Sequence, residues 1–300
     1  MNGKRTNMKE KSSKLSSELA KELKNKTILI TGGAGSIGST LTKKILDYPV
    51  HAVRLLDIDE YGLFKLNRSI NDSRLRLLLG NIEDSERLEI AVNGADIIIH
   101  TAAVKNIEIT EFNPIETINT NINGTVNLIR MAIKIKPLKF LNISTDKASH
   151  PSTLYGTTKQ IGERVTSWAG VHVMATKFAS VRLGNVFETR GNVFEVWEEE
   201  KKKNKPLSIT VPSMKRYYFH IEDAVDFILR CLPLANRGEI FVPKMSSYSI
   251  RDLANKISKN HRTIGLRQGE KLEEVLLTEY EMKRAEERKD MWVIKSYLPK

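Results

Sequence analysis

Residues 31–38 read Thr31-Gly32-Gly33-Ala34-Gly35-Ser36-Ile37-Gly38, and this stretch decides the fold. It stands between a short apolar run, Thr27 to Ile30, and an amphipathic run, Ile37 to Leu46. The glycines at 32, 35 and 38 allow a tight turn and let backbone N–H groups approach a pyrophosphate at the start of a helix. Spaced glycines also occur in ordinary loops, but the strand–turn–helix context predicts a dinucleotide-binding loop that includes Ser36 and Ile37.

Asp57 comes 19 residues after Gly38, at the end of the next apolar run, Ala52 to Leu56. A carboxylate at this place accepts hydrogen bonds from ribose hydroxyls and repels a 2′-phosphate. Asp59 is better placed as the N-cap of the following helix. Arg54 lies within the strand, so we do not interpret it as a clamp for a 2′-phosphate. The sequence therefore favours NAD over NADP as the cofactor, with both left open.

Short apolar runs alternate with amphipathic stretches, which is typical of a parallel sheet covered by helices. Further buried strands are expected at Leu75 to Leu79, Asp96 to His100 and Phe140 to Ser144. Helices are expected at Glu60 to Ile70, Ser85 to Val92, Pro114 to Lys134 and Leu154 to Ala169. The predicted fold class is α/β, a Rossmann-type doubly wound parallel sheet with a smaller C-terminal substrate-binding region.

The chain is expected to divide into three regions. Residues 1–25 are predicted to be a basic, flexible leader, solvated and partly helical from Ser13 to Lys26. The chemistry is not expected to need it, because it precedes the first strand and lacks the periodicity of a core helix. Residues 26–183 are predicted to form the dinucleotide-binding domain. Residues 184–300 are predicted to bind mainly the substrate, with some chain returning to the first domain.

Composition excludes several classes of protein. Of the 300 residues 40% are hydrophobic, which is enough for a core, and no apolar run approaches the ~20 residues of a membrane span. The charged N-terminus has no apolar segment of signal-peptide type, so we expect a cytoplasmic protein with no membrane partner. The single cysteine, Cys231, excludes a disulfide framework, and six scattered histidines predict no metal site.

The formal net charge is +12, of which residues 1–26 contribute +5 through eight Lys or Arg and three Glu. Such an excess suits nucleic acid or an anionic small molecule equally well. No zinc-finger spacing, RNA-recognition signature or basic heptad array accompanies it, so no nucleic-acid partner is expected.

A second set of residues carries chemistry: Ser144-Thr145-Asp146-Lys147, followed by Tyr155 and Lys159. Tyr155 and Lys159 stand at positions i and i+4, on one face of a helix. A phenol with a pKa of about 10 is a poor base at neutral pH. A neighbouring ammonium and a positive nicotinamide ring would favour the phenolate, making Tyr155 a base for a sugar hydroxyl during hydride transfer.

These residues resemble the extended short-chain dehydrogenase/reductase family over about Lys26 to Glu279. Further stretches are similar to nucleotide-sugar 4,6-dehydratases of the polysaccharide-biosynthesis type, above all the inverting group that acts on UDP-N-acetylglucosamine. The stretches are Ser144 to Ala148, His100 to Lys105, Asn119 to Gly124, Val181 to Val186, Gly238 to Lys244 and Arg267 to Glu273. Retaining members usually carry Met in place of Tyr155 and add transmembrane helices. One departure is Asn81, where the family usually has Asp beside the adenine.

The resemblance implies roles for the motif residues. Lys147 would remove the C5 proton, Asp146 would protonate the departing C6 hydroxyl, and Thr145 would bond O4 beside Tyr155. It extends the cofactor-binding set to Asn81, Ile82, Ala102, Ala103, Tyr155 and Lys159. The UDP-sugar contacts that it implies are Lys105, Asn185, Arg190, Gly191, Asn192, Arg216, Arg267 and Glu270.

Two other functions stay open. A UDP-sugar 4-epimerase would share Tyr155 and Lys159, but epimerases typically have small or hydroxyl residues where Asp146 and Lys147 stand. A non-catalytic dinucleotide-binding regulator would usually have lost part of this set. A retaining dehydratase is the alternative within the group. The resemblance also implies a homo-oligomer, with Pro114 to Lys134 and Leu154 to Ala169 at a dimer interface.

Overall fold

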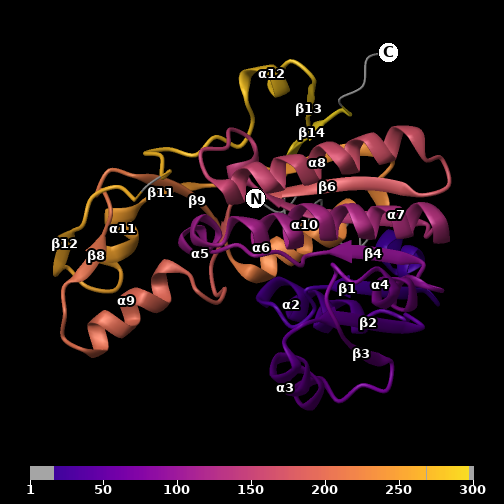
Figure 1. The fold of residues 1–300 in the computed structure, drawn as a ribbon. Helices are drawn as coiled ribbons and strands as arrows, with labels where there is room; N and C mark the ends of the chain where they lie inside the picture. The colour runs from indigo at the N-terminus through magenta and orange to yellow at the C-terminus, as the bar shows by residue number, and fades with distance from the viewer. Residues whose placement is uncertain (1–16, 268, 297–300) are drawn as a thin grey trace, which may run out of the picture.

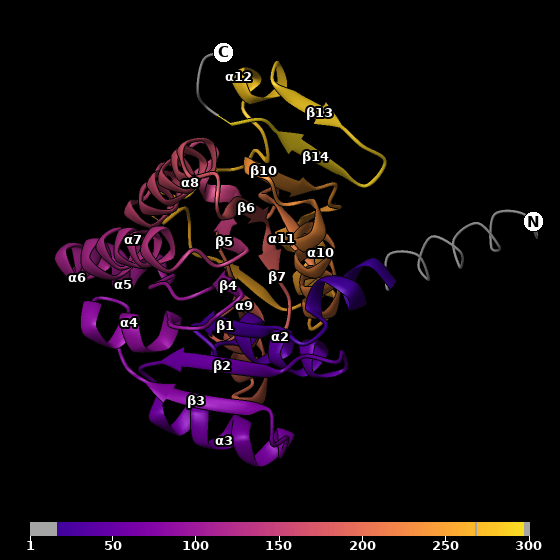
Figure 2. The same cartoon turned by 90° about the vertical axis from the view of Figure 1, so that its right-hand side faces the viewer.

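The computed structural model describes residues 17–267 and 269–296, and its centre is a nine-stranded sheet (Figures 1 and 2). Seven parallel strands lie in the order β3-β2-β1-β4-β5-β6-β10, and an antiparallel hairpin, β13–β14, extends the sheet beyond β10. The parallel strands are β1 (Thr27–Thr31), β2 (Ala52–Asp57), β3 (Leu75–Leu79), β4 (Ile97–His100), β5 (Lys139–Thr145), β6 (Lys177–Leu183) and β10 (Arg237–Pro243). The hairpin strands are β13 (Ala285–Glu287) and β14 (Met291–Ile294). This arrangement confirms the predicted doubly wound sheet.

Alternating residues of the central strands supply two hydrophobic cores, one on each face of the sheet. In β1, Ile28 and Ile30 belong to one core and Leu29 to the other, because successive side chains of a strand point to opposite faces. The first core is covered by α2 (Ser36–Leu46), α3 (Glu60–Ile70) and α10 (Ile221–Leu234). The second is covered by α4 (Ser85–Val92), α7 (Thr125–Ile135) and α8 (Leu154–His172).

The single helix expected at Pro114 to Lys134 is interrupted. The chain forms α6 (Pro114–Ile118), a π-helical turn at Asn119–Gly124, and then α7. Asn121 exchanges hydrogen bonds with the backbone of Val104, from Val104 N at 2.8 Å and to Val104 O at 2.9 Å. A Cβ at Gly124 would lie 2.6 Å from the Ile82 side chain. The widened turn thus lets this segment dock closely against the end of the sheet. A short helix that the sequence did not predict, α5 (Ile107–Phe112), precedes it.

The C-terminal part of the leader is helical, in line with the expected partly helical segment, but its apolar side chains are buried rather than solvated. Residues 17–23 are helical, and Leu19 and Leu23 are buried in the first core. Glu22 forms an ion pair with Lys139 at the start of β5, at 3.0 Å. Two leucines four residues apart make an apolar stripe too short to stand out among the lysines around it. Residues 1–16 of the leader lie outside the described chain.

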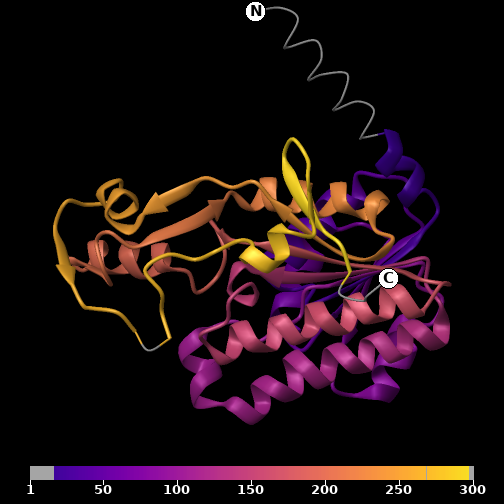
Figure 3. The same cartoon turned by 90° about the horizontal axis from the view of Figure 1, so that it is seen from above.

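The smaller region lies to one side of the sheet, where Figure 1 shows α9, α11, β8 and β12 together. Its core includes Trp197, Leu207, Met214 and Leu253. Its strands are β7 (Asn185–Val186), β9 (Lys215–Phe219) and β11 (Ser247–Ser249) in one sheet, and β8 (Leu207–Ile209) and β12 (His261–Thr263) in another. Its helices are α9 (Val193–Lys202) and α11 (Ile250–Asn255), whereas α12 (Glu279–Met282) lies beside the β13–β14 hairpin of the main sheet. Figure 3 shows this region extending away from the layered domain.

We expect Leu23→Ala to lower the free energy of unfolding by about 2–4 kcal/mol, because it leaves a cavity in the first core. The neighbouring Lys24→Ala removes an exposed side chain and should change it by less than about 0.5 kcal/mol. Urea denaturation of both variants measures the difference. Equal stabilities would show that the segment at 17–23 contributes nothing to the fold.

Candidate active site

The carboxyl ends of the parallel strands open into a cavity of about 730 Å³. Its walls come from the end of β5, the start of α8, the segment after β6 and a C-terminal stretch around residues 267–274. All eight residues that the resemblance implies as UDP-sugar contacts line it, and so do Thr145, Lys147, Tyr155 and Lys159. Ligands of doubly wound sheets bind at this edge, so the cavity is the candidate active site.

The glycine loop has the shape that a pyrophosphate requires. Gly32 has a φ of +69°, and a Cβ there would lie 2.7 Å from the backbone nitrogen of Ala102. A Cβ at Gly38 would lie 2.3 Å from the carbonyl oxygen of Gly32. Within the described chain, no side chain caps the first turn of α2, whose N-cap is Gly35. A backbone cradle at an uncapped helix N-terminus fits the phosphates of a dinucleotide.

Asp57 is held at the edge of this loop. Its carboxylate accepts hydrogen bonds from Ala34 N at 2.8 Å and from Asp59 N at 3.0 Å. Asp59 caps α3, accepting from Gly62 N at 2.8 Å, as the sequence predicted. Arg54 donates to the carbonyl oxygens of residues 91 and 93. The only carboxylate directly at the end of β2 is therefore that of Asp57.

The other predicted cofactor residues lie around the loop. Ala102 packs against Gly32, and Ala103 lines the cavity. Asn81 accepts a hydrogen bond from Glu83 N at 3.1 Å, and Ile82 is buried against the π-helical turn. Ser36 Oγ accepts a hydrogen bond from Arg190 N at 3.0 Å, which brings the segment after β6 onto the loop.

Asp146 is the most enclosed of the predicted catalytic residues, with 1% of its surface exposed. Its Oδ1 accepts hydrogen bonds from Thr145 Oγ1 at 3.0 Å and from Lys147 Nζ at 3.1 Å. Its Oδ2 and the neighbouring Ser144 Oγ have no hydrogen-bond partner in the described chain. Buried polar atoms without partners carry a free-energy cost that a bound ligand or water relieves. The ion pair of Asp146 and Lys147 thus lies beside the cavity, which Ser144 and Lys147 both line.

Tyr155 and Lys159 lie in the first two turns of α8, whose N-cap is Thr153. A Cβ at Gly156 would lie 2.5 Å from the carbonyl oxygen of Lys147, so the helix packs directly on the catalytic loop. Burial lowers the pKa of Lys159 to about 8, against the opposing effect of Glu163. A lysine with this pKa is still largely protonated at pH 7.

The surroundings of Tyr155 within the chain favour its neutral phenol. Burial and the nearby Asp146 raise the pKa of Tyr155 well above its usual range, while a hydrogen bond with Thr145 opposes them. Desolvation disfavours the phenolate more than the surroundings favour it. The positive nicotinamide ring that is expected beside Lys159 would act in the opposite direction, toward the phenolate.

His100 does not line the cavity but is buried in the layer next to it. It is fully buried at the end of β4, with Nδ1 2.7 Å from Thr31 Oγ1 and Nε2 2.9 Å from Thr125 Oγ1. Burial and Lys159 lower its pKa to about 3. The ring is therefore neutral at pH 7 and joins β1, β4 and α7.

Several predicted substrate residues already have partners within the chain. Arg190 donates to Ala34 O at 2.6 Å and pairs with Asp59 at 3.2 Å, so its guanidinium lies on the cofactor side of the cavity. Lys105 Nζ donates to Arg190 O at 2.9 Å, and burial lowers the pKa of this lysine. Asn192 caps α9. These contacts join the walls of the cavity to each other.

The remaining predicted substrate residues lie further from the glycine loop. Asn185 donates to Tyr217 O at 3.1 Å. Arg216 is buried and donates to the carbonyl oxygen of its neighbour Lys215 at 2.9 Å. Glu270 accepts from Arg267 N at 3.1 Å, which closes a small turn beside the cavity. Gly191 has a φ of +71° in the segment that carries Arg190.

Sequence reasoning missed three carboxylates of the cavity wall, Glu108, Glu111 and Glu274, and the last of these lies beside the catalytic pair. Glu274 is 8% exposed, and its Oε1 lies 3.6 Å from Lys147 Nζ. The signal was within reach, because Glu274 directly follows the stretch Arg267 to Glu273 that carries the resemblance.

Comparison with known proteins shows one family and relatives with two named activities, a 4,6-dehydratase and a 4-epimerase. A family model described as polysaccharide biosynthesis protein matches residues 28–296. UDP-N-acetylglucosamine 4,6-dehydratase (inverting) of Campylobacter jejuni strain 81-176 is 37% identical over 84% of this chain and 78% of the relative. UDP-glucose 4-epimerase of Rickettsia bellii strain RML369-C is 35% identical over 88% of this chain and 81% of the relative. An uncharacterized membrane protein of Methanocaldococcus jannaschii is 39% identical, over 91% and 87% respectively.

Two solved structures share the fold. Pen from Bacillus thuringiensis has a TM-score of 0.88 at 34% identity, covering 93% of this chain and 90% of that chain. The dTDP-glucose 4,6-dehydratase DesIV from Streptomyces venezuelae, solved with NAD and TYD bound, has a TM-score of 0.77 at 22% identity, covering 86% of this chain and 90% of that chain.

Among the helices in the described ranges, none is long and apolar enough to cross a membrane.

We expect Gly38→Ala to weaken dinucleotide binding by at least about tenfold, because the added Cβ collides with the Gly32 backbone and distorts the phosphate cradle. Gly162→Ala in α8 is the matched control, since its Cβ would lie 3.4 Å from the nearest atom. Calorimetric titration with NAD and NADP measures both variants. Unchanged affinity in Gly38→Ala would remove the loop from the cofactor site.

Proposed function

Because the chain belongs to the polysaccharide biosynthesis protein family and its relatives include nucleotide-sugar dehydratases and epimerases, we propose that it is a UDP-N-acetylglucosamine 4,6-dehydratase that inverts C5. The observation that carries the proposal is the buried Asp146–Lys147 pair on the cavity wall. A 4-epimerase needs no elimination and therefore no such acid–base pair. The likeness to the named inverting dehydratase supports the substrate and the stereochemistry.

The cofactor is a nicotinamide dinucleotide, for which the glycine loop and Asp57 are fitted. When bound, it would accept a hydride from C4 of the sugar and later return it to C6. Tyr155 would take the proton of the C4 hydroxyl, with Thr145 holding the oxygen. The Lys159 ammonium would stabilise the phenolate form of Tyr155 that takes this proton.

Elimination needs a base at C5 and an acid at C6 at the same moment. In the resting pair the proton is on Lys147, which donates to Asp146 across 3.1 Å. Movement of that proton along the hydrogen bond leaves a neutral amine and a carboxylic acid, the two forms that the reaction requires. Lys147 then takes the C5 proton while Asp146 gives its proton to the departing hydroxyl, which leaves as water. The step restores the ion pair, so its protons balance.

We expect Lys147→Ala and Asp146→Asn each to lower kcat for dehydration by about 10²–10⁴-fold, the usual loss of a general acid or base. Both variants should still bind the cofactor, because neither residue belongs to the glycine loop. Lys134→Ala, which removes an exposed lysine of α7 paired with Glu89, should keep wild-type turnover. Wild-type rates in either site variant would exclude the pair from the chemistry.

We expect the protein to bind NAD more tightly than NADP, because the Asp57 carboxylate repels a 2′-phosphate. Asp57→Asn keeps an oxygen that can accept from the loop but loses the charge. The ratio of the affinities for NAD and NADP should fall about tenfold, which corresponds to ~1.4 kcal/mol. Titration of wild type and variant with both nucleotides is the measurement. Tighter binding of NADP to the wild type would show that neighbouring residues reshape this pocket.

The function is tested by turnover of UDP-N-acetylglucosamine in D₂O, followed by NMR. We expect UDP-2-acetamido-2,6-dideoxy-β-L-arabino-hex-4-ulose with deuterium at C5, because C5 is reprotonated from solvent-exchanged groups on the opposite face. A D-xylo product formed with no earlier L-arabino form would assign retention. UDP-N-acetylgalactosamine as the product, with C6 unchanged, would assign the epimerase reaction instead.

A further inference from the structure

Glu274 faces the same lysine as Asp146 but belongs to a distant part of the chain. Its carboxylate lines the cavity, with Oε1 3.6 Å from Lys147 Nζ and Oε2 3.9 Å from Lys271 Nζ. The Glu274 side chain is 6% exposed and the Lys147 side chain 16% exposed. The Lys147 ammonium is thus flanked by two buried carboxylates, one of which has no role in the proposed reaction.

Glu274 is carried by a segment that is fixed against the catalytic loop, residues 269–281, which we call the C-terminal strap. At its start, Gly269 O accepts a hydrogen bond from Ser152 Oγ at 2.6 Å. Lys271 Nζ donates to the carbonyl oxygen of His150. Gly269 has a φ of +77°, and a Cβ there would lie 2.8 Å from the Thr153 side chain. The strap therefore lies directly on the turn between Lys147 and α8.

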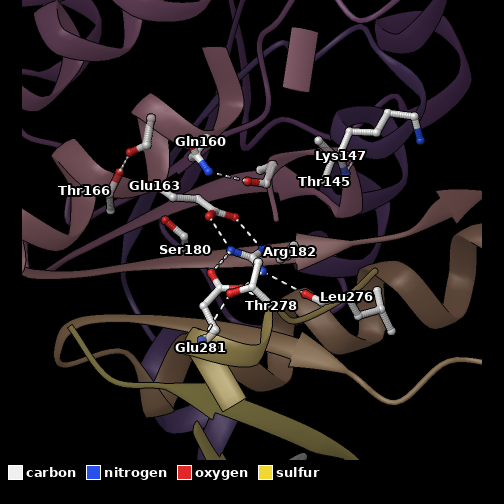
Figure 4. A network of polar contacts seen from close by, with 12 residues as sticks. Thr145, Lys147, Gln160, Glu163, Thr166, Ser180, Arg182, Leu276, Thr278 and Glu281 are labelled. Carbon is white, nitrogen blue, oxygen red and sulfur yellow. Dashed lines mark hydrogen bonds and ion pairs between the residues drawn. The ribbon is translucent and has the colours of Figure 1, made fainter. Parts of the chain in front are cut away.

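The far end of the strap is anchored in the interior (Figure 4). Arg182 of β6 donates to Leu276 O at 2.8 Å and to both oxygens of Glu281, at 3.0 and 2.7 Å. Arg182 also binds both oxygens of Glu163 in α8, at 2.9 and 2.7 Å. Since Leu276 and Leu277 are buried as well, the position of Glu274 is set from both sides.

We propose that Glu274 is a positioning residue for the elimination step, acting through Lys147. This inference rests on the proposed function. A lysine side chain turns freely about four carbon–carbon bonds, so a second carboxylate restricts where its nitrogen lies. The fixed charge of Glu274 stabilises the Lys147 cation both in the resting pair and after it takes the C5 proton, so its specific effect on elimination is to hold the nitrogen in place. Glu274 itself exchanges no proton in the step.

This role predicts a loss confined to elimination. In Glu274→Gln, kcat for dehydration should fall about 10–100-fold, the scale of a misplaced catalytic group. KM for UDP-N-acetylglucosamine and the affinity for the cofactor should stay within about twofold. Oxidation at C4, seen as the absorbance of reduced cofactor at 340 nm, should persist. The kinetic isotope effect of substrate deuterated at C5 should increase, because C–H cleavage becomes slower relative to the other steps.

Glu273→Gln is the matched control. Glu273 is the adjacent residue of the strap, but it is exposed and pairs with Lys215 at 2.9 Å. It should keep wild-type kcat and isotope effect. Glu274→Asp keeps the charge on a shorter side chain. It should lose less activity than Glu274→Gln, and its kinetic isotope effect should increase less than that of Glu274→Gln. Thermal unfolding of all three variants checks that each is folded.

The outcomes separate the two proposals. If the wild type releases no 4-keto-6-deoxy sugar, the proposed function is overturned and the role of Glu274 with it. If the wild type forms that product and Glu274→Gln matches it in kcat and isotope effect, only the role of Glu274 is overturned. Parallel losses of kcat, substrate affinity and melting temperature, with the isotope effect unchanged, would show a structural role and overturn it equally.

Discussion

The interaction on which the rest depends is the sharing of one buried cation by two carboxylates. Arg182 is fully buried, and Glu163 from α8 and Glu281 from the strap both bind it in two-point contacts. Removing one partner of a buried pair costs about 3–5 kcal/mol, because it leaves an uncompensated charge in a low dielectric. The same arginine thus fixes the helix that presents Tyr155 and Lys159 and the segment that presents Glu274. Arg182 therefore sets the positions of α8 and of the C-terminal strap on either side of Asp146 and Lys147.

Elements with a strong local signal were predicted well from the sequence. The bounds of β3, α3 and α4 agree with those expected, because their apolar periodicity and capping residues lie within the elements themselves. The π-helical turn at Asn119–Gly124 was not predicted. Its cause lies in contacts of Asn121 with Val104 and of Gly124 with Ile82, which appear only once the sheet is formed. The buried leucines of the leader were missed because two apolar residues are too short a pattern to indicate a buried helix face.

The candidate site divides along a similar line. Asp146 and Lys147 are neighbours in the sequence, so their pairing at the end of a predicted strand could be expected. The sequence marks Glu274 as the neighbour of a motif stretch, but it does not show that Glu274 lies beside Lys147, since that depends on how the C-terminal segment crosses the sheet. The burial of Tyr155 could not be predicted either, because spacing on a helix shows which groups are close but not how much water they lose.

The segment after β6 has a consequence for how the cofactor is used. Arg190 binds Ala34 O and Asp59, its backbone nitrogen binds Ser36, and Lys105 holds its carbonyl oxygen. These contacts lie across the glycine loop and fasten the smaller region to it. In the proposed reaction the electrons taken from C4 return to C6 of the same sugar, so each cycle ends with the cofactor in its starting oxidation state. A chain that never needs a second redox partner can keep one nucleotide for its working life, and a fastened loop suits such residence better than rapid exchange.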